Sequence, residues 1–387
     1  MAGNYSAKEM LTKLVAFDTV SRNSNLPLIE FVEEYLSSHG VSSQRVPNED
    51  GTKTNLWATI GPNTDGGVIL SGHTDVVPVD GQPWDTDPFE VIEKDGLLYG
   101  RGTADMKAFS AIALSLVPEM LRSNMKRPIH LALSYDEEIG CLGAPLMVED
   151  MAPRVKAEAV IVGEPTMMQV VSGHKGVIGL MTKVRGLEVH SSLLHTGVSA
   201  VHIAAKLVVW HEQKTKENKL RTEHLAENAL FEPGYTSLHC GVIHGGTAHN
   251  ITAKDCSFSS DFRVLPTEDP LQYLEEYRAY VAELEAEMKA IDPSTGITID
   301  VLANVPGCRR ENDGAAERLV RQITGDNAEH VVSYGTEAGQ FQDGGYSTIV
   351  CGPGDIAQAH AANEFLSIEQ LNAGEDFQRK LIERLAS

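Results

Sequence analysis

The chain has 387 residues, which is more than one ordinary hydrophobic core organises, so two domains are expected. Its 54 acidic residues outnumber 32 basic ones, and the formal charge of −22 argues against nucleic acid as a partner. Because no eighteen apolar residues run together and the first residues lack a signal-peptide pattern, we expect a cytoplasmic protein without a membrane span. The five cysteines are widely spaced and are expected to be free thiols.

The first half of the chain has the alternating pattern of an α/β sheet. Helices are predicted over residues 6–17 and 27–38, and Ser6 with Glu9 has the pattern of a capping box. The elements that follow are a strand at 68–70, a helix at 108–121, a strand at 129–134 and a strand at 159–162. Polar residues come directly after these strands, where α/β sheets carry their chemistry.

The middle of the chain predicts a separate module with the order β-α-β-β-α-β, typical of a ferredoxin-like fold. Its elements are a strand at 176–185, a helix at 199–216, strands at 236–243 and 256–264, a helix at 269–290 and a strand at 297–303. We therefore expect residues 175–306 to be inserted into a larger α/β domain made of residues 1–174 and 307–387.

Histidine and carboxylate side chains follow the predicted strands of the larger domain. They are His73, Asp75, Asp105, Glu137, Glu138 and Glu164, with His360 near the C-terminus. Imidazole and carboxylate together suit zinc, manganese or cobalt, and the set is large enough for two divalent ions. We expect zinc first, with cobalt or manganese as alternatives.

Two local patterns indicate how these residues divide the work. In an extended segment His73 and Asp75 point the same way, so the aspartate can accept the second ring N–H of the imidazole. Glu137 and Glu138 are adjacent and diverge, so one can bind metal while the other acts as a general base.

Each residue taken alone also has a structural interpretation. His73 can be a buried histidine beside a turn aspartate, Glu137 and Glu138 an exposed acidic turn, Glu164 a loop carboxylate and His360 a helix-start histidine. The glycine-rich segment at 100–107 has a phosphate-binding loop as its rival, but no Gly-Lys-Ser/Thr follows it.

Together the motifs resemble the M20 family of zinc-dependent aminoacylases and deacylases from end to end. The matching signatures are SGHTDVVP at residues 71–78, YGRGTADMK at 99–107 and DEEIG at 136–140, in the family's order. The resemblance implies an aminopeptidase-like α/β/α catalytic domain that binds two metal ions. It places His73 and Glu164 on one ion, Glu138 and His360 on the other, and Asp105 between them, with Asp75 orienting His73 and Glu137 as general base. It also implies a cis peptide bond at Asp105-Met106.

The inserted module resembles the family's lid and dimerisation domain, so a homodimer is implied. The segment GLEVHSS at 186–192 makes His190 the candidate for holding the oxyanion in the partner's active site, with His195 as a competitor. Asn250 and Arg263 are implied substrate contacts, although Arg263 can also be a strand-surface arginine.

The segment SYGTEAGQF at 333–341 resembles the Gly-Thr-Glu-Ala segment of acetylornithine deacetylases. Glu337 can pair with the side-chain ammonium of ornithine, and the negative charge of the chain has the matching sign. We expect a small-molecule N-acyl amino acid as substrate, N2-acetyl-L-ornithine first, which would place the enzyme in arginine biosynthesis. Within the family, a succinyl-diaminopimelate desuccinylase, a general aminoacylase and a dipeptidase remain alternatives. A non-catalytic metal-binding or assembly protein is the alternative from another class.

Overall fold

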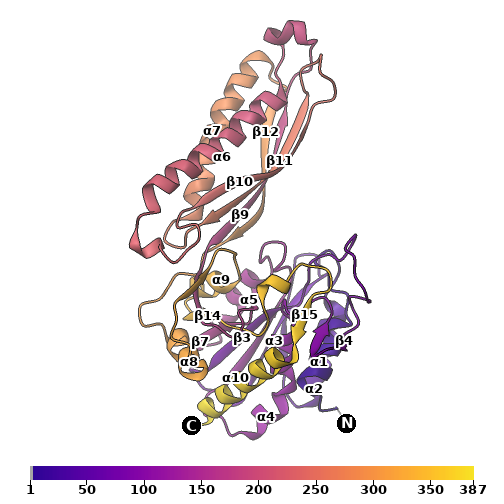
Figure 1. Cartoon of the computed structure of the whole chain (residues 1–387), viewed down its shortest axis with the longest axis vertical. Helices are drawn as coiled ribbons and strands as arrows, with labels where there is room; N and C mark the ends of the chain where they lie inside the picture. The colour runs from indigo at the N-terminus through magenta and orange to yellow at the C-terminus, as the bar shows by residue number, and fades with distance from the viewer. Residues whose placement is uncertain (1–2) are drawn as a thin grey trace. The chain divides into compact units, whose positions relative to one another are not determined.

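The chain forms two compact units in a computed structural model that describes residues 3–387. The first unit contains the residues up to Gly173, together with Cys308–His330 and Thr336–Ser387. The second unit contains His174–Gly307 and the short segment Val331–Gly335. The boundaries expected from the sequence were 174/175 and 306/307, and Val331–Gly335 was expected in the larger domain rather than in the second unit. In Figure 1 the colours show that both ends of the chain belong to the first unit.

The first unit is built on an eight-stranded sheet with the strand order β1-β2-β6-β3-β7-β14-β8-β13. Strands β6, β3, β7 and β14 run parallel to one another. The eight strands are β1 (Ser43–Pro47), β2 (Thr54–Ile60), β3 (Val68–His73), β6 (Ile129–Ser134), β7 (Ala159–Val162), β8 (Val171–His174), β13 (His330–Val332) and β14 (Thr348–Val350). A smaller sheet contains β4 (Ile92–Lys94), β5 (Leu97–Tyr99) and β15 (Phe365–Ser367). The parallel strands β3, β6 and β7 at the centre of the large sheet are buried along their whole length, as a sheet covered on both faces requires.

Helices pack around the large sheet and share its core. They are α1 (Ala7–Val15), α2 (Leu26–Ser38), α3 (Lys107–Ser115), α4 (Val117–Arg122), α5 (Ala144–Met151), α8 (Ala315–Thr324), α9 (Ala338–Asp343) and α10 (Ile368–Ala386), with a 3-10 turn η3 (Ile356–Gln358). Buried side chains of α1, α2, α3 and α10 form one hydrophobic cluster with β2, β3, β6 and β7. Helices α5 and α9 contact one another, α5 also contacts β1, β2 and β6, and α9 also contacts β7 and β14.

Two helix ends show how the local sequence decides the structure. Ser6 caps α1 and forms the expected capping box with Glu9, so that prediction is confirmed. The single helix predicted at 108–121 is wrong, because α3 ends at Ser115 and α4 starts at Val117. Pro118 has no N–H to donate to the carbonyl four residues earlier, which breaks the helix at Leu116.

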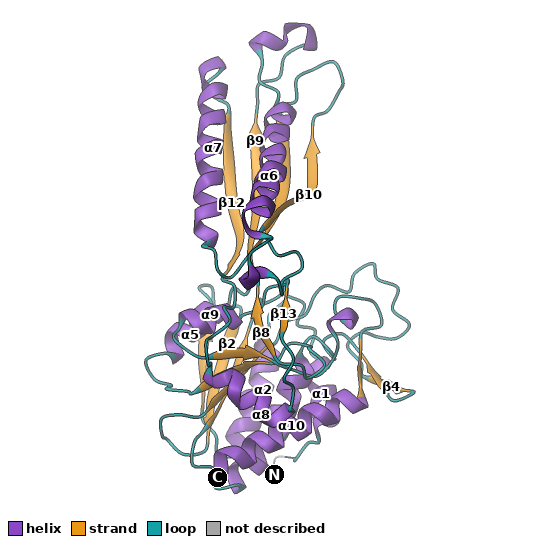
Figure 2. Cartoon of the chain, turned by 60° about the vertical axis from the view of Figure 1, so that its left-hand side comes forward, coloured by secondary structure: helices purple, strands orange, loops and turns teal. Residues whose placement is uncertain are grey.

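The second unit is a four-stranded antiparallel sheet with two long helices. Its elements are β9 (Gly176–Arg185), η1 (Ser191–Thr196), α6 (Ala200–Thr222), η2 (Ala226–Asn228), β10 (Ser237–Gly245), β11 (Asp255–Val264), α7 (Pro270–Ile291) and β12 (Gly296–Val305). The strand order β10-β11-β9-β12 with this chain order is the ferredoxin-like arrangement. Buried residues of α6 and α7 share a core with one face of the sheet, and Figure 2 shows both helices beside the strands.

All five cysteines are free thiols, as expected from their spacing. Among residues 3–387, no helix combines the length and the apolar character needed to cross a membrane.

Candidate metal centre

The sheet of the first unit brings the predicted ligands to one edge. His73 is the last residue of β3, Glu137 and Glu138 come three and four residues after β6, and Glu164 comes two residues after β7. Since these strands are parallel neighbours, their carboxyl ends lie together. Asp105 precedes α3, and the loop after η3 carries His360.

Asp105 lies between the two histidines. Its Oδ1 is 3.0 Å from His73 Nε2, and its Oδ2 is 3.4 Å from His360 Nε2. On the His360 side, Glu138 Oε2 is 3.0 Å from the same Nε2, and on the His73 side Glu164 Oε1 is 3.9 Å away. The set therefore divides into two halves that share one carboxylate.

Two properties of this cluster fit divalent cations. Ligand atoms of His73, Asp105 and Glu138 all lie within 4.8 Å of one another, and those of His73, Glu137 and Glu164 do so as well. The buried Oε1 of Glu164 accepts no hydrogen bond from any residue between 3 and 387. A buried carboxylate oxygen without a donor is costly, and a cation would satisfy it. Glu137 belongs to one of the two groups, so position alone allows it to be a ligand.

Burial, together with the crowding of acids, raises the pKa of the two glutamates that follow β6. Burial, and then the charges of neighbouring carboxylates, raise the pKa of Glu137 to about 8. Burial and the Asp105 charge raise the pKa of Glu138 to about 7. Hydrogen bonds to Asp105 and Glu138 raise the pKa of His360 to about 10, against the effect of burial. A bound cation would relieve this repulsion and favour ionised carboxylates.

The raised pKa of Glu137 predicts a pH effect on the stability of metal-free protein. Between pH 4.5 and about 8 the folded state holds a proton on Glu137 that the unfolded state has lost. The free energy of unfolding therefore falls as pH rises through this window, by roughly a few kcal/mol for this one group. Glu137→Gln removes the group that titrates. In urea denaturation with chelator present, the free energy of unfolding of the variant should therefore rise relative to that of wild type between pH 5 and pH 8. Parallel pH curves for the two proteins would contradict this expectation.

Asp75 is buried, and it contacts His73 through a different atom from the one predicted. The Nδ1 atom of His73 is 2.9 Å from the backbone carbonyl oxygen of Asp75, whereas the nearest carboxylate oxygen is 3.7 Å away. The carboxylate instead accepts the backbone N–H groups of Glu137 and Glu138, at 3.1 and 3.3 Å, and the hydroxyl of Ser21 at 2.7 Å. Asp75 thus orients His73 through its backbone, while its side chain holds the turn that carries the two glutamates.

Glu364 was missed by sequence reasoning. Its carboxylate is 1% exposed and accepts N–H groups of Gly102, Ala104 and Asp105 at 2.8 to 3.0 Å, and Arg101 at 2.8 Å. It therefore ties the loop of His360 to the loop of Asp105. The only signal in the sequence is an acid four residues after His360, which does not distinguish it from a surface glutamate. The Asp105-Met106 peptide bond in this loop is cis, as the resemblance implied.

The remaining predicted site residues are divided between the units. Glu337, in the first unit, is 1% exposed, and its carboxylate oxygens accept the hydroxyls of Ser71 and Ser134. A substrate ammonium would have to compete with both contacts.

Within the second unit, His190 and Asn250 lie on adjacent segments, joined by the hydrogen bond from Ser191 N–H to the Asn250 carbonyl. His195, the competitor of His190, is exposed on η1. Arg263 lies at the other end of the sheet, where β11 ends and the chain enters and leaves the unit. The eight residue-to-residue steps from Asp255 to Arg263 span about 26 Å of strand. Arg263 Nε donates to Asp261 at 2.9 Å.

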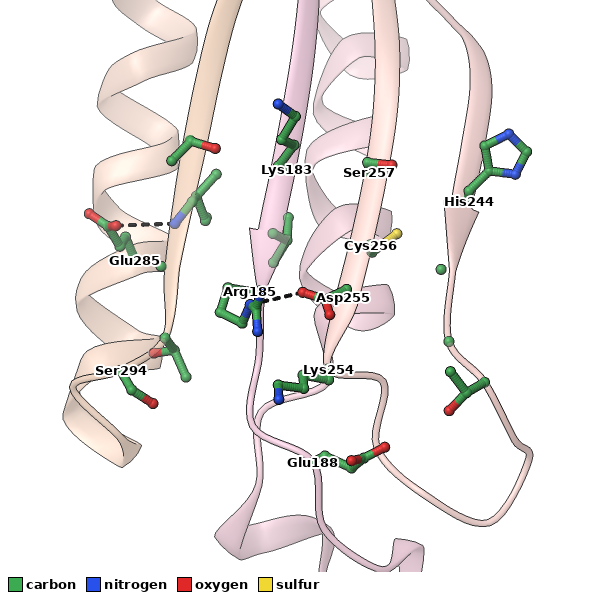
Figure 3. Close-up of a pocket in the computed structure, with 18 residues that line it drawn as sticks. Lys183, Arg185, Glu188, His244, Lys254, Asp255, Cys256, Ser257, Glu285 and Ser294 are labelled. Atoms are coloured by element: carbon green, nitrogen blue, oxygen red, sulfur yellow. Dashed lines mark hydrogen bonds and ion pairs between the residues drawn. The ribbon is translucent and has the colours of Figure 1, made fainter.

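A cavity in the second unit lies against the ends of β9, β11 and β12 and holds none of the predicted site residues. Figure 3 shows its charged lining, in which Arg185 pairs with Asp255. Glu285 in the same lining accepts the backbone N–H of Ile297. Because Arg185 is paired with Asp255 and Glu285 is bonded to a backbone N–H, we assign no chemistry to this cavity.

The comparison with known proteins agrees with the geometry of the first unit. The model of peptidase family M20/M25/M40 matches residues 69–384. The chain is 35% identical over 373 residues to an acetylornithine deacetylase of Myxococcus xanthus, covering 93% of this chain and 92% of that protein. It is 32% identical over 382 residues to an acetylornithine deacetylase of Pasteurella multocida, covering 97% and 96%. Its fold is similar to an M20 family metallo-carboxypeptidase from Sulfolobus solfataricus, with a TM-score of 0.76, 18% identity and 99% of each chain covered. The chain is therefore a hydrolase that belongs to peptidase family M20/M25/M40.

Proposed function

We propose that this chain hydrolyses N2-acetyl-L-ornithine to L-ornithine and acetate. The observation that carries the proposal is an acid, Glu137, whose carboxylate lies within 4.8 Å of ligand atoms of His73 and Glu164 and is additional to the five proposed ligands. A site that only binds metal has no need of this extra group. The names of the relatives from Myxococcus xanthus and Pasteurella multocida support the choice of acyl substrate.

The proposed ligands follow the two halves of the cluster. His73 and Glu164 would hold one ion, Glu138 and His360 the other, and Asp105 both. Two divalent ions bound there, zinc in the first instance, would polarise the acyl carbonyl and make water more acidic. The histidine and carboxylate donors suit zinc, cobalt and manganese alike.

Glu137 is the proposed general base and acid. Its carboxylate takes a proton from the attacking water, whose oxygen forms a bond to the acyl carbon. It then gives the proton to the amine nitrogen as the C–N bond breaks, which leaves acetate and a free α-amine. The thiol of Cys141 donates to Glu137 Oε1 at 3.3 Å, which leaves Oε2 to meet the water.

His190 is the proposed donor to the oxyanion. Its Nδ1 accepts the backbone N–H of Ser192 at 3.2 Å, so in the neutral ring the proton is on Nε2, ready to be donated. His190 and Asn250 lie at one end of their sheet. Arg263 lies at the other end, and it is at the Arg263 end that the chain connects to the first unit. We propose a homodimer in which His190 and Asn250 serve the partner's site, as the resemblance of residues 186–192 implies, and in which Arg263 binds the substrate carboxylate.

The test of the substrate is a panel of N-acyl amino acids assayed under one set of conditions. We expect kcat/KM to be highest for N2-acetyl-L-ornithine and lower for N-acetyl-L-methionine, N-succinyl-diaminopimelate and dipeptides. The negative charge of the chain repels the anion N-acetyl-L-methionine more than the zwitterion N2-acetyl-L-ornithine, so the advantage of the ornithine compound over the methionine compound should shrink at high ionic strength. A higher kcat/KM for the succinyl compound or for dipeptides would show that the proposed substrate is wrong. The assignment as a hydrolase would still stand.

A further inference from the structure

Glu337 is a buried carboxylate behind the metal centre. It is the N-cap residue of α9 and is 1% exposed. Its Oε1 accepts the hydroxyl of Ser71 and its Oε2 accepts the hydroxyl of Ser134, at 2.5 and 2.7 Å. Both oxygens are therefore occupied by donors from inside the protein.

The two serines are the neighbours of metal-site residues on adjacent strands. Ser134 on β6 pairs with His73 on β3 in the parallel ladder, and Ser71 lies two residues before His73. Side chains of paired residues, and of residues two apart, lie on the same face of a sheet. Glu337 thus links β3 and β6 on the face that carries His73, just behind it.

The same contacts tie Glu337 to the other strand ends. The carbonyl of Ser71 accepts the backbone N–H of Gly163, the residue before Glu164. The carbonyl of Ser134 accepts the backbone N–H and the hydroxyl of Thr74. One carboxylate therefore holds serines whose backbones are bonded to the segments of His73 and Glu164.

We propose that Glu337 is a positioning residue of the metal centre, which holds the ends of β3 and β6 in register and adds a fixed negative charge behind the cations. This role replaces the ammonium contact expected from the sequence, and it rests on the metal site of the proposed function but not on the identity of the acyl substrate. Carboxylates outside the coordination shell that orient ligands typically change metal affinity or activity by about 10–100-fold when replaced.

The test measures zinc affinity and kinetics of Glu337→Gln. The glutamine side chain keeps partners for both hydroxyls but removes the charge. We expect zinc affinity, measured by competition with a chelator on metal-free protein, to fall about 10–100-fold. The ratio of KM for N2-acetyl-L-ornithine to KM for N-acetyl-L-methionine should stay within about twofold of wild type, because a positioning residue touches neither substrate.

The matched control is Glu268→Gln in the second unit. Glu268 is also a largely buried carboxylate that accepts two hydroxyls, those of Thr236 and Tyr273, but it lies on the strand-to-helix connection before α7. Its replacement should leave zinc affinity unchanged. Equal losses of zinc affinity in both variants would mean that the effect is general destabilisation and would overturn the proposal.

Two further outcomes would also overturn it. A rise in KM for N2-acetyl-L-ornithine alone, with unchanged zinc affinity, would return Glu337 to the substrate site. Unchanged affinity and unchanged kinetics would leave it without either role.

If Glu337→Gln does not fold, Ser71→Ala and Ser134→Ala each remove one contact and should weaken zinc binding; unchanged affinity in both would contradict the proposal. If wild-type protein hydrolyses neither substrate, the zinc titration still decides the role of Glu337, and only the proposed function fails.

Discussion

Glu137→Gln is expected to lower kcat for hydrolysis of N-acyl amino acids by about 10²–10⁴-fold while the protein keeps two bound ions. The glutamine amide has nearly the shape of the carboxylate but takes no proton from water. The cause of the loss is therefore chemical, and KM should change little. The measurements are steady-state kinetics and metal content by elemental analysis on the same preparation.

The neighbouring residue supplies the control. Glu138 is 3.0 Å from His360 Nε2 and is a proposed ligand, so Glu138→Gln should lose both metal and activity. The two variants differ by one position and should separate base from ligand. Because ligand atoms of Glu137, His73 and Glu164 lie within 4.8 Å of one another, loss of metal from Glu137→Gln would show that Glu137 is a ligand and that the base lies elsewhere.

Mixing two inactive proteins is expected to restore activity. In a dimer of one Glu137→Gln subunit and one His190→Ala subunit, the site with an intact Glu137 receives an intact His190 from its partner. With random exchange, half of the dimers are mixed and half of their sites are complete, so about one quarter of the wild-type activity should return. The measurement is turnover after subunit exchange, with sedimentation to establish the dimer.

His195→Ala is the control for this experiment, because its ring lies five residues away on η1 in the same unit. It should be active without any mixing. If mixed Glu137→Gln and His190→Ala subunits stay inactive although mixed dimers form, His190 does not act across the interface. Activity of His190→Ala alone together with inactivity of His195→Ala would move the oxyanion contact to His195.

The elements that bear the chemistry could be predicted because their signal is local. Strands β6 and β7 have the bounds expected from apolar runs, since a buried strand between turns leaves little freedom in its limits, and β9 also has its expected bounds. The grouping of His73, Asp105 and Glu138 followed from motif order, and the structure places their ligand atoms within 4.8 Å of one another. Residues far apart in sequence meet there because parallel strands end at one edge.

Contacts that depend on packing could not be predicted. The spacing of His73 and Asp75 indicated that they meet, but not that the backbone carbonyl rather than the carboxylate receives the imidazole. Glu337 has the charge expected of an ammonium partner, yet only the fold shows that Ser71 and Ser134 cover it. Glu364 gave no signal because three of its four partners are backbone N–H groups, which every residue except proline possesses.

The most direct measurement of the central claim is product release from N2-acetyl-L-ornithine by the same protein before chelation, after chelation and after zinc is returned. We predict equal amounts of ornithine and acetate before chelation, none after it, and recovery with two zinc ions per chain. Activity that survives complete removal of metal, or a protein that binds two ions and hydrolyses no N-acyl amino acid, would contradict the account.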